Sequence, residues 1–263
     1  MAFPAFLAAG QIQGLAVLNY PDYIPQRWHV TLIMIAILLV CGFFNTSLAQ
    51  KLHIVEGAIM ALHIAGFFGI LITLWVTSEK ANSKEVWTSF YDPGWGNRGL
   101  SSLIGIVASV APLLGADASA HMAEELQDAA WSLPRTIVWA VVANGAMMFI
   151  LAITLCYCIG DLDSVLATPT GFPYIQILLN STGSAAATAG LTSIVIVLNI
   201  ASSITIMAGS SRQMFAFARD QGLPSSGWVA RINRGFDAPV NSIVVSFAIS
   251  STYRSHRRLS RIL

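Results

Sequence analysis

The stretch from Leu113 to Arg135, LLGADASAHMAEELQDAAWSLPR, contains the features that decide the fold. Pro112 and Gly115 interrupt the apolar segment that leads into it. The ionisable side chains that follow are Asp117, His121, Glu124, Glu125, Asp128 and Arg135. A bilayer tolerates broken backbone and charged groups only where protein or a water-filled cavity surrounds them. A helix that breaks beside a carboxylate near the midplane is how many secondary transporters build a substrate site. The alternative is an ordinary helix that ends near Ser109, followed by a solvated acidic loop.

The composition places the chain in a membrane. Of its 263 residues, 55% are hydrophobic and only 10% are charged, and the mean hydropathy is +0.67. Soluble domains carry about 25% charged residues. The formal net charge of +1 argues against a nucleic-acid partner, which would need a basic field. We therefore expect an all-α, polytopic helix bundle in contact with membrane lipid.

Apolar stretches near the length of about 20 residues that a spanning helix needs divide the sequence. Seven such segments are predicted, at residues 3–19, 29–49, 54–77, 101–122, 136–159, 184–208 and 239–251. Small and amide residues in the first segment favour a helix packed inside a bundle. The apolar stretch TGFPYIQILL, within the connection at 160–183, is too short to span and is expected to pack as a lid or at the interface.

Basic residues orient the predicted bundle. The connection at 210–238 is the longest basic loop, and cytoplasmic loops are enriched in Lys and Arg. Placing it inside puts six basic residues on that side (Arg212, Arg219, Arg231, Arg234, Lys51 and Arg135) and four on the other (Arg27, Lys80, Lys84 and Arg98). The sequon Asn180-Ser181-Thr182 then lies outside and Asn45-Thr46-Ser47 inside.

The C-terminal sequence STYRSHRRLSRIL differs from everything before it. It contains four arginines and directly follows SIVVSFAIS, so the seventh segment has only about 13 residues. We predict a permease domain over residues 1–250 and an aberrant basic tail over 251–263, which is typical of a shifted reading frame or an unspliced intron. A genuine basic juxtamembrane tail is the alternative.

Four motifs in this order resemble the fungal choline and amino-acid permeases of the amino acid–polyamine–organocation superfamily. They are FFNTSLAQKLHIVEG, APLLGADASAHMAEELQDAAWSLPR, CIGDLDSVLATPTGFPYIQILLNSTGS, and SSRQMFAFARDQGLP followed by DAPVNSIVVSFAIS. The resemblance implies a transporter with about twelve spans in inverted repeats, of which the seven segments resemble spans three to nine. It further implies that the first two spans, with half of the substrate site, are absent, and that the chain is truncated at both ends.

The resemblance places Gly115, Ala116 and Asp117 on the broken sixth span, where they are the predicted substrate-binding residues. Glycine and alanine let a ligand approach bare backbone, and a helix interruption frees amides and carbonyls to bind it. Asp117 can pair with the ammonium group of choline or of an amino acid. Equally, Asp117 can cap the half-helix that follows, because aspartate accepts hydrogen bonds from free amides at a helix start.

Proton coupling or gating is predicted for His63, His121, Glu124, Ser202 and Ser203. His121 lies four residues after Asp117, on the same helix face, and histidine exchanges protons near neutral pH. His63 lies on the equivalent of the family's fifth span, where the resemblance implies a basic group in place of a coupling ion. Ser202 and Ser203 are near the corresponding ion-site position. The alternatives are packing histidines, a solvated charge at Glu124, and serines bonded to their own helix.

The sequence thus predicts a secondary transporter, with a small-molecule substrate that is an amino acid, choline or another organocation, in the plasma or vacuolar membrane. No cofactor or metal is expected, because Cys-x-Cys lacks further ligands and H-x-x-E-E lacks the second histidine of a zinc site. The main alternative is a non-functional truncated or mis-annotated gene product. A seven-span receptor and a membrane enzyme that uses His121 and Glu124 fit less well, since the enzyme would lack a second catalytic cluster.

Overall fold

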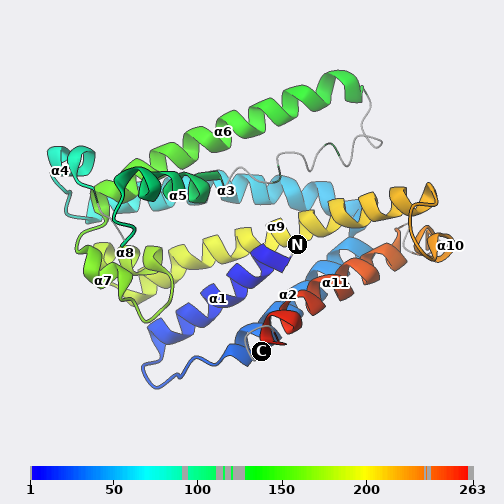
Figure 1. Cartoon of the computed structure of the whole chain (residues 1–263), viewed down its shortest axis with the longest axis horizontal. Coiled ribbons are helices and arrows are strands. Elements are labelled where there is room, and N and C mark those ends of the chain that lie inside the picture. The colour runs from blue at the N-terminus through cyan, green and yellow to red at the C-terminus, as the bar shows by residue number, and fades with distance from the viewer. Residues whose placement is uncertain are drawn as a thin grey trace. The chain divides into compact units, whose positions relative to one another are not determined.

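The computed structural model describes residues 2–90, 94–110, 115, 120, 128–233, 235 and 238–259. The regular elements in these ranges are helices, drawn in Figure 1. They are α1 (Ala2–Asn19), α2 (Arg27–Ser47), the 3-10 turn η1 (Ala49–Lys51), α3 (Leu52–Thr77), α4 (Ser83–Thr88), α5 (Arg98–Val110), α6 (Ala129–Cys158), α7 (Leu162–Leu166), α8 (Pro173–Thr182), α9 (Ala185–Arg219), α10 (Ser226–Val229) and α11 (Val240–Leu259).

Within the described ranges, five helices are long and apolar enough to cross a membrane: α1, α2, α3, α6 and α9. They overlap five of the seven predicted segments. The predicted start of the segment at 136–159 is wrong by seven residues, because α6 begins at Ala129 and includes Pro134 and Arg135. Of the predicted segment 101–122, the described part forms the C-terminal portion of α5, and most of 111–122 lies outside the described residues. The last predicted segment forms the apolar part of α11, which continues past residue 250; the predicted domain boundary there remains a prediction.

The predicted basic loop at 210–238 is wrong in its first third. Helix α9 continues to Arg219, so Arg212 lies on the helix and Arg219 ends it. The reason is local, since the sequence from Ser210 to Arg219 contains neither proline nor glycine and nothing interrupts the backbone hydrogen bonds. At 35 residues, α9 is about 52 Å long, against about 30 Å of hydrocarbon. Its polar C-terminal turns therefore extend beyond the apolar layer.

The described chain forms two compact units. Unit 1 comprises residues 1–66, 169–172 and 185–263, and unit 2 comprises residues 67–168 and 173–184. In unit 1, α1 packs on α9 and α2, as Figure 1 shows. The face of α1 at this contact is made of small residues, and Ala5, Ala8 and Ala9 are completely buried. Small side chains let helix backbones approach closely, so the predicted packing of this segment inside a bundle is confirmed.

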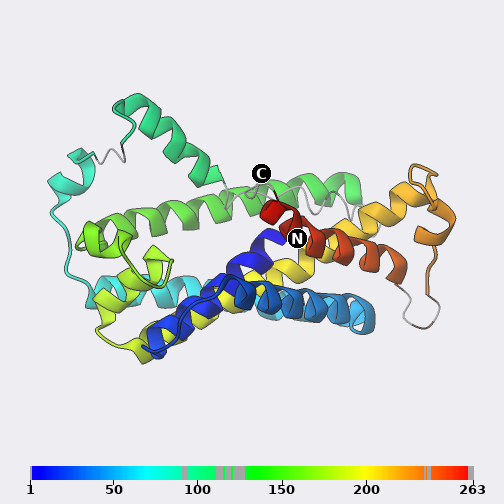
Figure 2. The same ribbon diagram turned by 60° about the horizontal axis from the view of Figure 1, so that its bottom comes forward.

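Unit 2 is held together by hydrogen bonds near the C-terminal ends of α3 and α6. The Trp75 indole donates to the Thr154 hydroxyl at 3.0 Å, and the Cys158 thiol lies 3.6 Å from the carbonyl of Leu74. Helices α7 and α8 pack against each other, and α8 also packs on α6 (Figure 2). Ile175, Ile177 and Leu178 of α8 are buried, so the part of the predicted lid or interfacial stretch from Pro173 onward forms a packed short helix.

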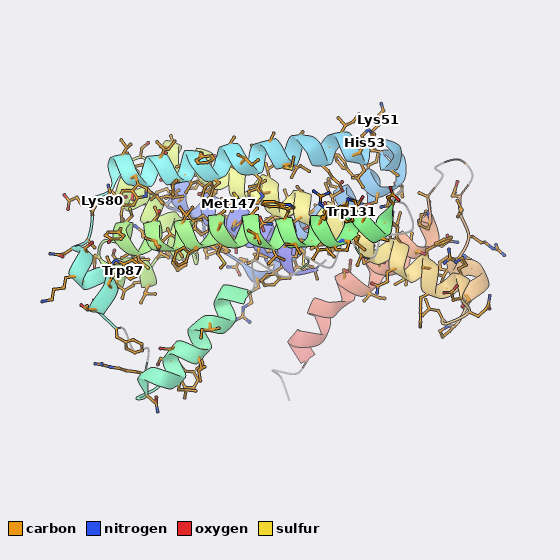
Figure 3. The ribbon with its side chains drawn as sticks, turned by 90° about the horizontal axis from the view of Figure 1, so that it is seen from above. Lys51, His53, Lys80, Trp87, Trp131 and Met147 are labelled. Atoms are coloured by element: carbon orange, nitrogen blue, oxygen red, sulfur yellow. The ribbon has the colours of Figure 1, made fainter. Side chains whose placement is uncertain are left out.

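Helix α4 is attached to the same end of unit 2 through one tyrosine. The Tyr157 hydroxyl accepts a hydrogen bond from the Trp87 indole at 3.1 Å and lies 2.6 Å from the Ser83 hydroxyl. Figure 3 shows Trp87 at the end of the unit that also carries Lys80, whose ammonium lies 5.7 Å from the centre of the Trp75 ring. Aromatic and cationic side chains of this kind are typical of the membrane–water interface, where an apolar ring and a polar group are both satisfied.

The three cysteines are free. Cys41 and Cys158 are buried, as expected of small core residues, whereas Cys156 is exposed on the surface of α6. All three cysteines lie inside apolar runs of the sequence, which predicts small core residues, and this prediction is wrong for Cys156. The cause is helix geometry: residues two positions apart on a helix point to different sides, so Cys156 and Cys158 cannot share the buried face.

The predicted orientation can be tested by cysteine labelling. In a Cys156→Ser background, Ser89→Cys should react with a membrane-impermeant thiol reagent added to intact cells, and Asp220→Cys should react only after permeabilisation. Both positions are exposed, whereas Ser226, in the same basic region, is buried and would be an unsuitable reporter. The reverse labelling pattern would contradict the orientation drawn from the basic residues.

Candidate substrate and coupling site

Helix α5 ends one residue after Ser109, near the point where the sequence analysis allows either a broken span or the end of an ordinary helix, and the choice between the two remains a prediction. Helix α5 ends at Val110, and Gly115 has a φ of +92°, a value that a right-handed helix cannot contain. A side chain at this position would be strained although no atom lies within 4 Å of where its Cβ would be. Glycine is therefore required by the backbone conformation, not by a close neighbour. The predicted substrate-binding role of Gly115 remains a prediction.

The other predicted residues of this segment, Ala116, Asp117, His121 and Glu124, lie outside the described residues. Their roles in binding, proton coupling or gating remain predictions from the sequence. The same holds for the choice between a substrate ligand and a helix cap at Asp117.

His63 lies on α3 and its side chain is exposed. It is one turn before Gly66, where α3 makes a close contact with α9: a Cβ on Gly66 would lie 2.6 Å from Ile194 Cγ2. Residues three apart are neighbours on a helix surface, so His63 occupies the part of α3 next to this contact. An exposed imidazole on a spanning helix is costly in lipid, which favours a location facing protein or water.

The two predicted serines have different environments on α9. Ser203 is completely buried, and its hydroxyl donates to the backbone carbonyl of Asn199 at 2.9 Å. This bond to the helix backbone is the ordinary arrangement for a serine within a span. Ser202 is exposed. The structure thus does not bring the two hydroxyls together at one point, and their role in coupling remains a prediction.

Polar contacts between helices in unit 1 were missed by the sequence analysis. The Asn199 amide on α9 donates to the Gln11 side-chain oxygen on α1 at 3.0 Å, and Gln11 is 5% exposed. The buried Asn45 amide on α2 donates to the backbone carbonyls of Cys41 at 2.9 Å and of Ile204 on α9 at 3.0 Å. Such bonds contribute about 0.6–2 kcal/mol each in membrane proteins. An amide residue inside an apolar segment was the available signal, but it did not identify the partner.

The Asn45 bonds also bear on the two sequons. With both amide contacts made inside a helical span, Asn45 is buried, whereas Asn180 is exposed on α8 and accepts a hydrogen bond from Gln176 at 2.8 Å. In the folded chain, therefore, only Asn180 of the two sequon asparagines has an exposed side chain.

Phe67 and Phe68 are neighbouring aromatic residues on α3, and aromatic rings can bind a quaternary ammonium group through cation–π attraction. The ring centres are 5.2 Å apart in an edge-to-face arrangement, and Phe68 is 51% exposed. This geometry is the one that aromatic rings prefer for packing on each other. It neither selects nor rules out a quaternary ammonium ligand.

Several apolar spanning helices, a helix that ends before a positive-φ glycine and buried interhelical amides together define an integral, multi-pass membrane protein of the permease class. The sequence profile of the amino acid permease family matches residues 1–253. The chain belongs to this family, whose members are transporters and not enzymes.

Three fungal relatives illustrate the similarity. A putative amino acid/polyamine transporter of Macrophomina phaseolina is 35% identical over 95% of the chain and 55% of its own length. The choline transporter of Saccharomyces cerevisiae is 28% identical over 91% of the chain and 43% of its own length, and an uncharacterised amino-acid permease of Schizosaccharomyces pombe is 29% identical over 92% and 43%. The chain thus spans about half the length of the curated relatives it matches.

Proposed function

We propose that the chain forms part of the substrate pathway of a proton-coupled secondary transporter for amino acids, choline or a related organocation. The observation that carries this proposal is the φ of +92° at Gly115, within the predicted span 101–122, in a member of the amino acid permease family. Gly115 and Ala116, whose side chains are small or absent, are proposed to let the substrate approach the backbone, and Asp117 is proposed to supply a carboxylate.

The chemistry of the relatives' substrates supports this assignment. Amino acids, polyamines and choline, the compounds in the relatives' names, all carry a positively charged nitrogen. A carboxylate beside free backbone carbonyls attracts such a group, and the cost of burying the carboxylate is offset when the cation arrives. Asp117 is accordingly the residue proposed to recognise the feature that these substrates share.

Alternating access requires two parts that rearrange around the bound substrate. The sequence analysis expects the segments 101–122 and 184–208 to belong to different moving parts. Their described helices support this, since α5 lies in unit 2 and α9 lies in unit 1. His121 and Glu124, which follow the break, are proposed to contribute to proton relay or gating at its cytoplasmic end.

Proton coupling is proposed to use His63, and its test separates coupling from transport. His63→Gln should leave measurable uptake but abolish its dependence on external pH, because glutamine keeps hydrogen-bonding groups without gaining a charge. The measurement is the ratio of uptake at about pH 5 to that at about pH 7, expected to fall to about one.

The matched control for this experiment is His53→Gln. His53 is also exposed and lies ten residues earlier on the same helix, at the N-terminal end of α3. Figure 3 labels it there. It should leave the pH ratio unchanged. A normal ratio in the His63→Gln protein would assign the coupling proton to another group.

A further inference from the structure

Helix α3 is shared between the two units. The boundary lies between Gly66 and Phe67, in the middle of a helix that is continuous from Leu52 to Thr77. The other transitions between the units, at 168/169, 172/173 and 184/185, lie in connections or at the start of a helix. Among the described helices, α3 is therefore the one whose interior would have to bend if the units rearrange.

On the side of this boundary that belongs to unit 1, α3 makes a close contact with α9. A Cβ on Gly66 would lie 2.6 Å from Ile194 Cγ2, so the α3 backbone contacts a β-branched side chain of α9 without any side chain between them. Close approach of this kind is what glycine permits at helix–helix contacts in membranes. Among the glycines of α3, Gly66 is thus the one that makes such a contact with α9.

Three residues further on, the packing constraint is gone. A Cβ on Gly69 would meet no atom within 4 Å, so packing does not require glycine here. Glycine nevertheless weakens a helix, because its backbone loses more conformational freedom on folding than that of any other residue. Gly69 is not required by packing, and it lies one turn beyond Gly66. The turn at Gly69 is therefore expected to be the least stable turn of α3 near the boundary.

Side-chain hydroxyls weaken the same turn. The Thr73 hydroxyl donates to the carbonyl of Gly69 at 2.7 Å, and the Thr77 hydroxyl donates to the carbonyl of Thr73 at 2.8 Å. Threonine bonds of this type add a competitor for a helix carbonyl, and they often bend the helix. The Gly69 carbonyl therefore accepts a hydrogen bond from the Thr73 hydroxyl, and Gly69 itself has no side chain to stabilise this turn.

We propose that residues 66–73 of α3 are a flexible joint between unit 1 and unit 2, with Gly66 as its anchor and Gly69 as its pivot. Hinges in proteins are a few residues that absorb a backbone change between two packed bodies. The joint is a property of the fold and goes beyond the proposed transport function.

The test measures the distance between two spin labels on either side of the joint. The labels are attached to cysteines at Met60 and Val76, both exposed, about 24 Å apart along a straight helix. The protein is reconstituted in lipid nanodiscs without substrate, with Cys156→Ser as background. A joint predicts a broad or two-peaked distance distribution, which Gly69→Ala should narrow to one peak, since alanine strengthens the helix and fits the open space.

Two further variants complete this experiment. Thr73→Val removes the competing hydroxyl and should also narrow the distribution. Gly57→Ala, another glycine of α3 with no atom within 4 Å of its Cβ position, lies outside the labelled interval and should leave the distribution unchanged. A single narrow peak in the unmodified protein, or a broad one that neither Gly69→Ala nor Thr73→Val narrows, would overturn the joint. Since no substrate is present, a failure of the proposed transport function would not affect this readout.

Discussion

Asp117→Asn is expected to reduce uptake at low substrate concentration at least tenfold, with normal surface expression. The asparagine keeps the shape of the side chain and part of its hydrogen bonding, but it removes the charge that is proposed to bind the substrate's ammonium group. A tenfold loss corresponds to about 1.4 kcal/mol of binding free energy. The measurement is initial uptake of labelled choline and of a panel of labelled amino acids, together with surface biotinylation.

A helix cap gives the opposite outcome, because an asparagine caps a helix nearly as well as an aspartate. Asp161 supplies the matched control. Its carboxylate caps α7 by accepting from the backbone amides of Asp163 at 3.2 Å and Ser164 at 3.3 Å, and Asp161→Asn should leave uptake unchanged. If Asp117→Asn behaves like Asp161→Asn, Asp117 is a cap and does not bind the substrate's cation.

Gly66→Ala is expected to destabilise the contact between α3 and α9. The added methyl group would lie 2.6 Å from Ile194 Cγ2, far inside the usual separation of about 3.5–4 Å between carbon atoms. Overpacking of this kind costs about 1–3 kcal/mol. Alanine regains up to about 1 kcal/mol of helix propensity, which is too little to reverse the sign. The midpoint of thermal unfolding in detergent should fall.

The control for this prediction is Gly57→Ala on the same helix, where no atom lies within 4 Å of the new methyl group. It should leave the unfolding midpoint unchanged or raise it slightly, since only the propensity gain remains. Equal midpoints for Gly66→Ala and Gly57→Ala would show that α3 does not depend on its close approach to Ile194. A second variant, Gly66→Ala with Ile194→Ala, should recover part of the loss by making room for the methyl group.

The positions of the spans were predictable because they depend on length and hydropathy alone. A helix satisfies its own backbone in lipid, so a long apolar run forms a helix whatever its neighbours are. Five predicted segments accordingly match described spanning helices, and the permease class follows from motifs that are local in the sequence. The non-helical backbone at Gly115 was predictable for the same reason, since glycine acts on its own turn of backbone.

The extension of α9 to Arg219 was harder to predict from the sequence. The basic residues are typical of a loop, but no proline or glycine ends the helix before Arg219. Which side chains of the spanning helices are buried was harder still to predict. They are apolar on nearly all sides, so hydrophobic periodicity does not separate a face toward lipid from a face toward protein. The exposure of Cys156 beside the buried Cys158 is one result of this ambiguity.

The sequence by itself determined the membrane environment, the place of most spans and the family, because each rests on local composition or local sequence motifs. Only the tertiary structure decided which residues meet: Gln11 with Asn199, Asn45 with the Ile204 carbonyl, and Gly66 with Ile194. It also divided α3 between two units. These pairings join residues more than one hundred positions apart, and they depend on shape complementarity between helices that hydropathy alone does not encode.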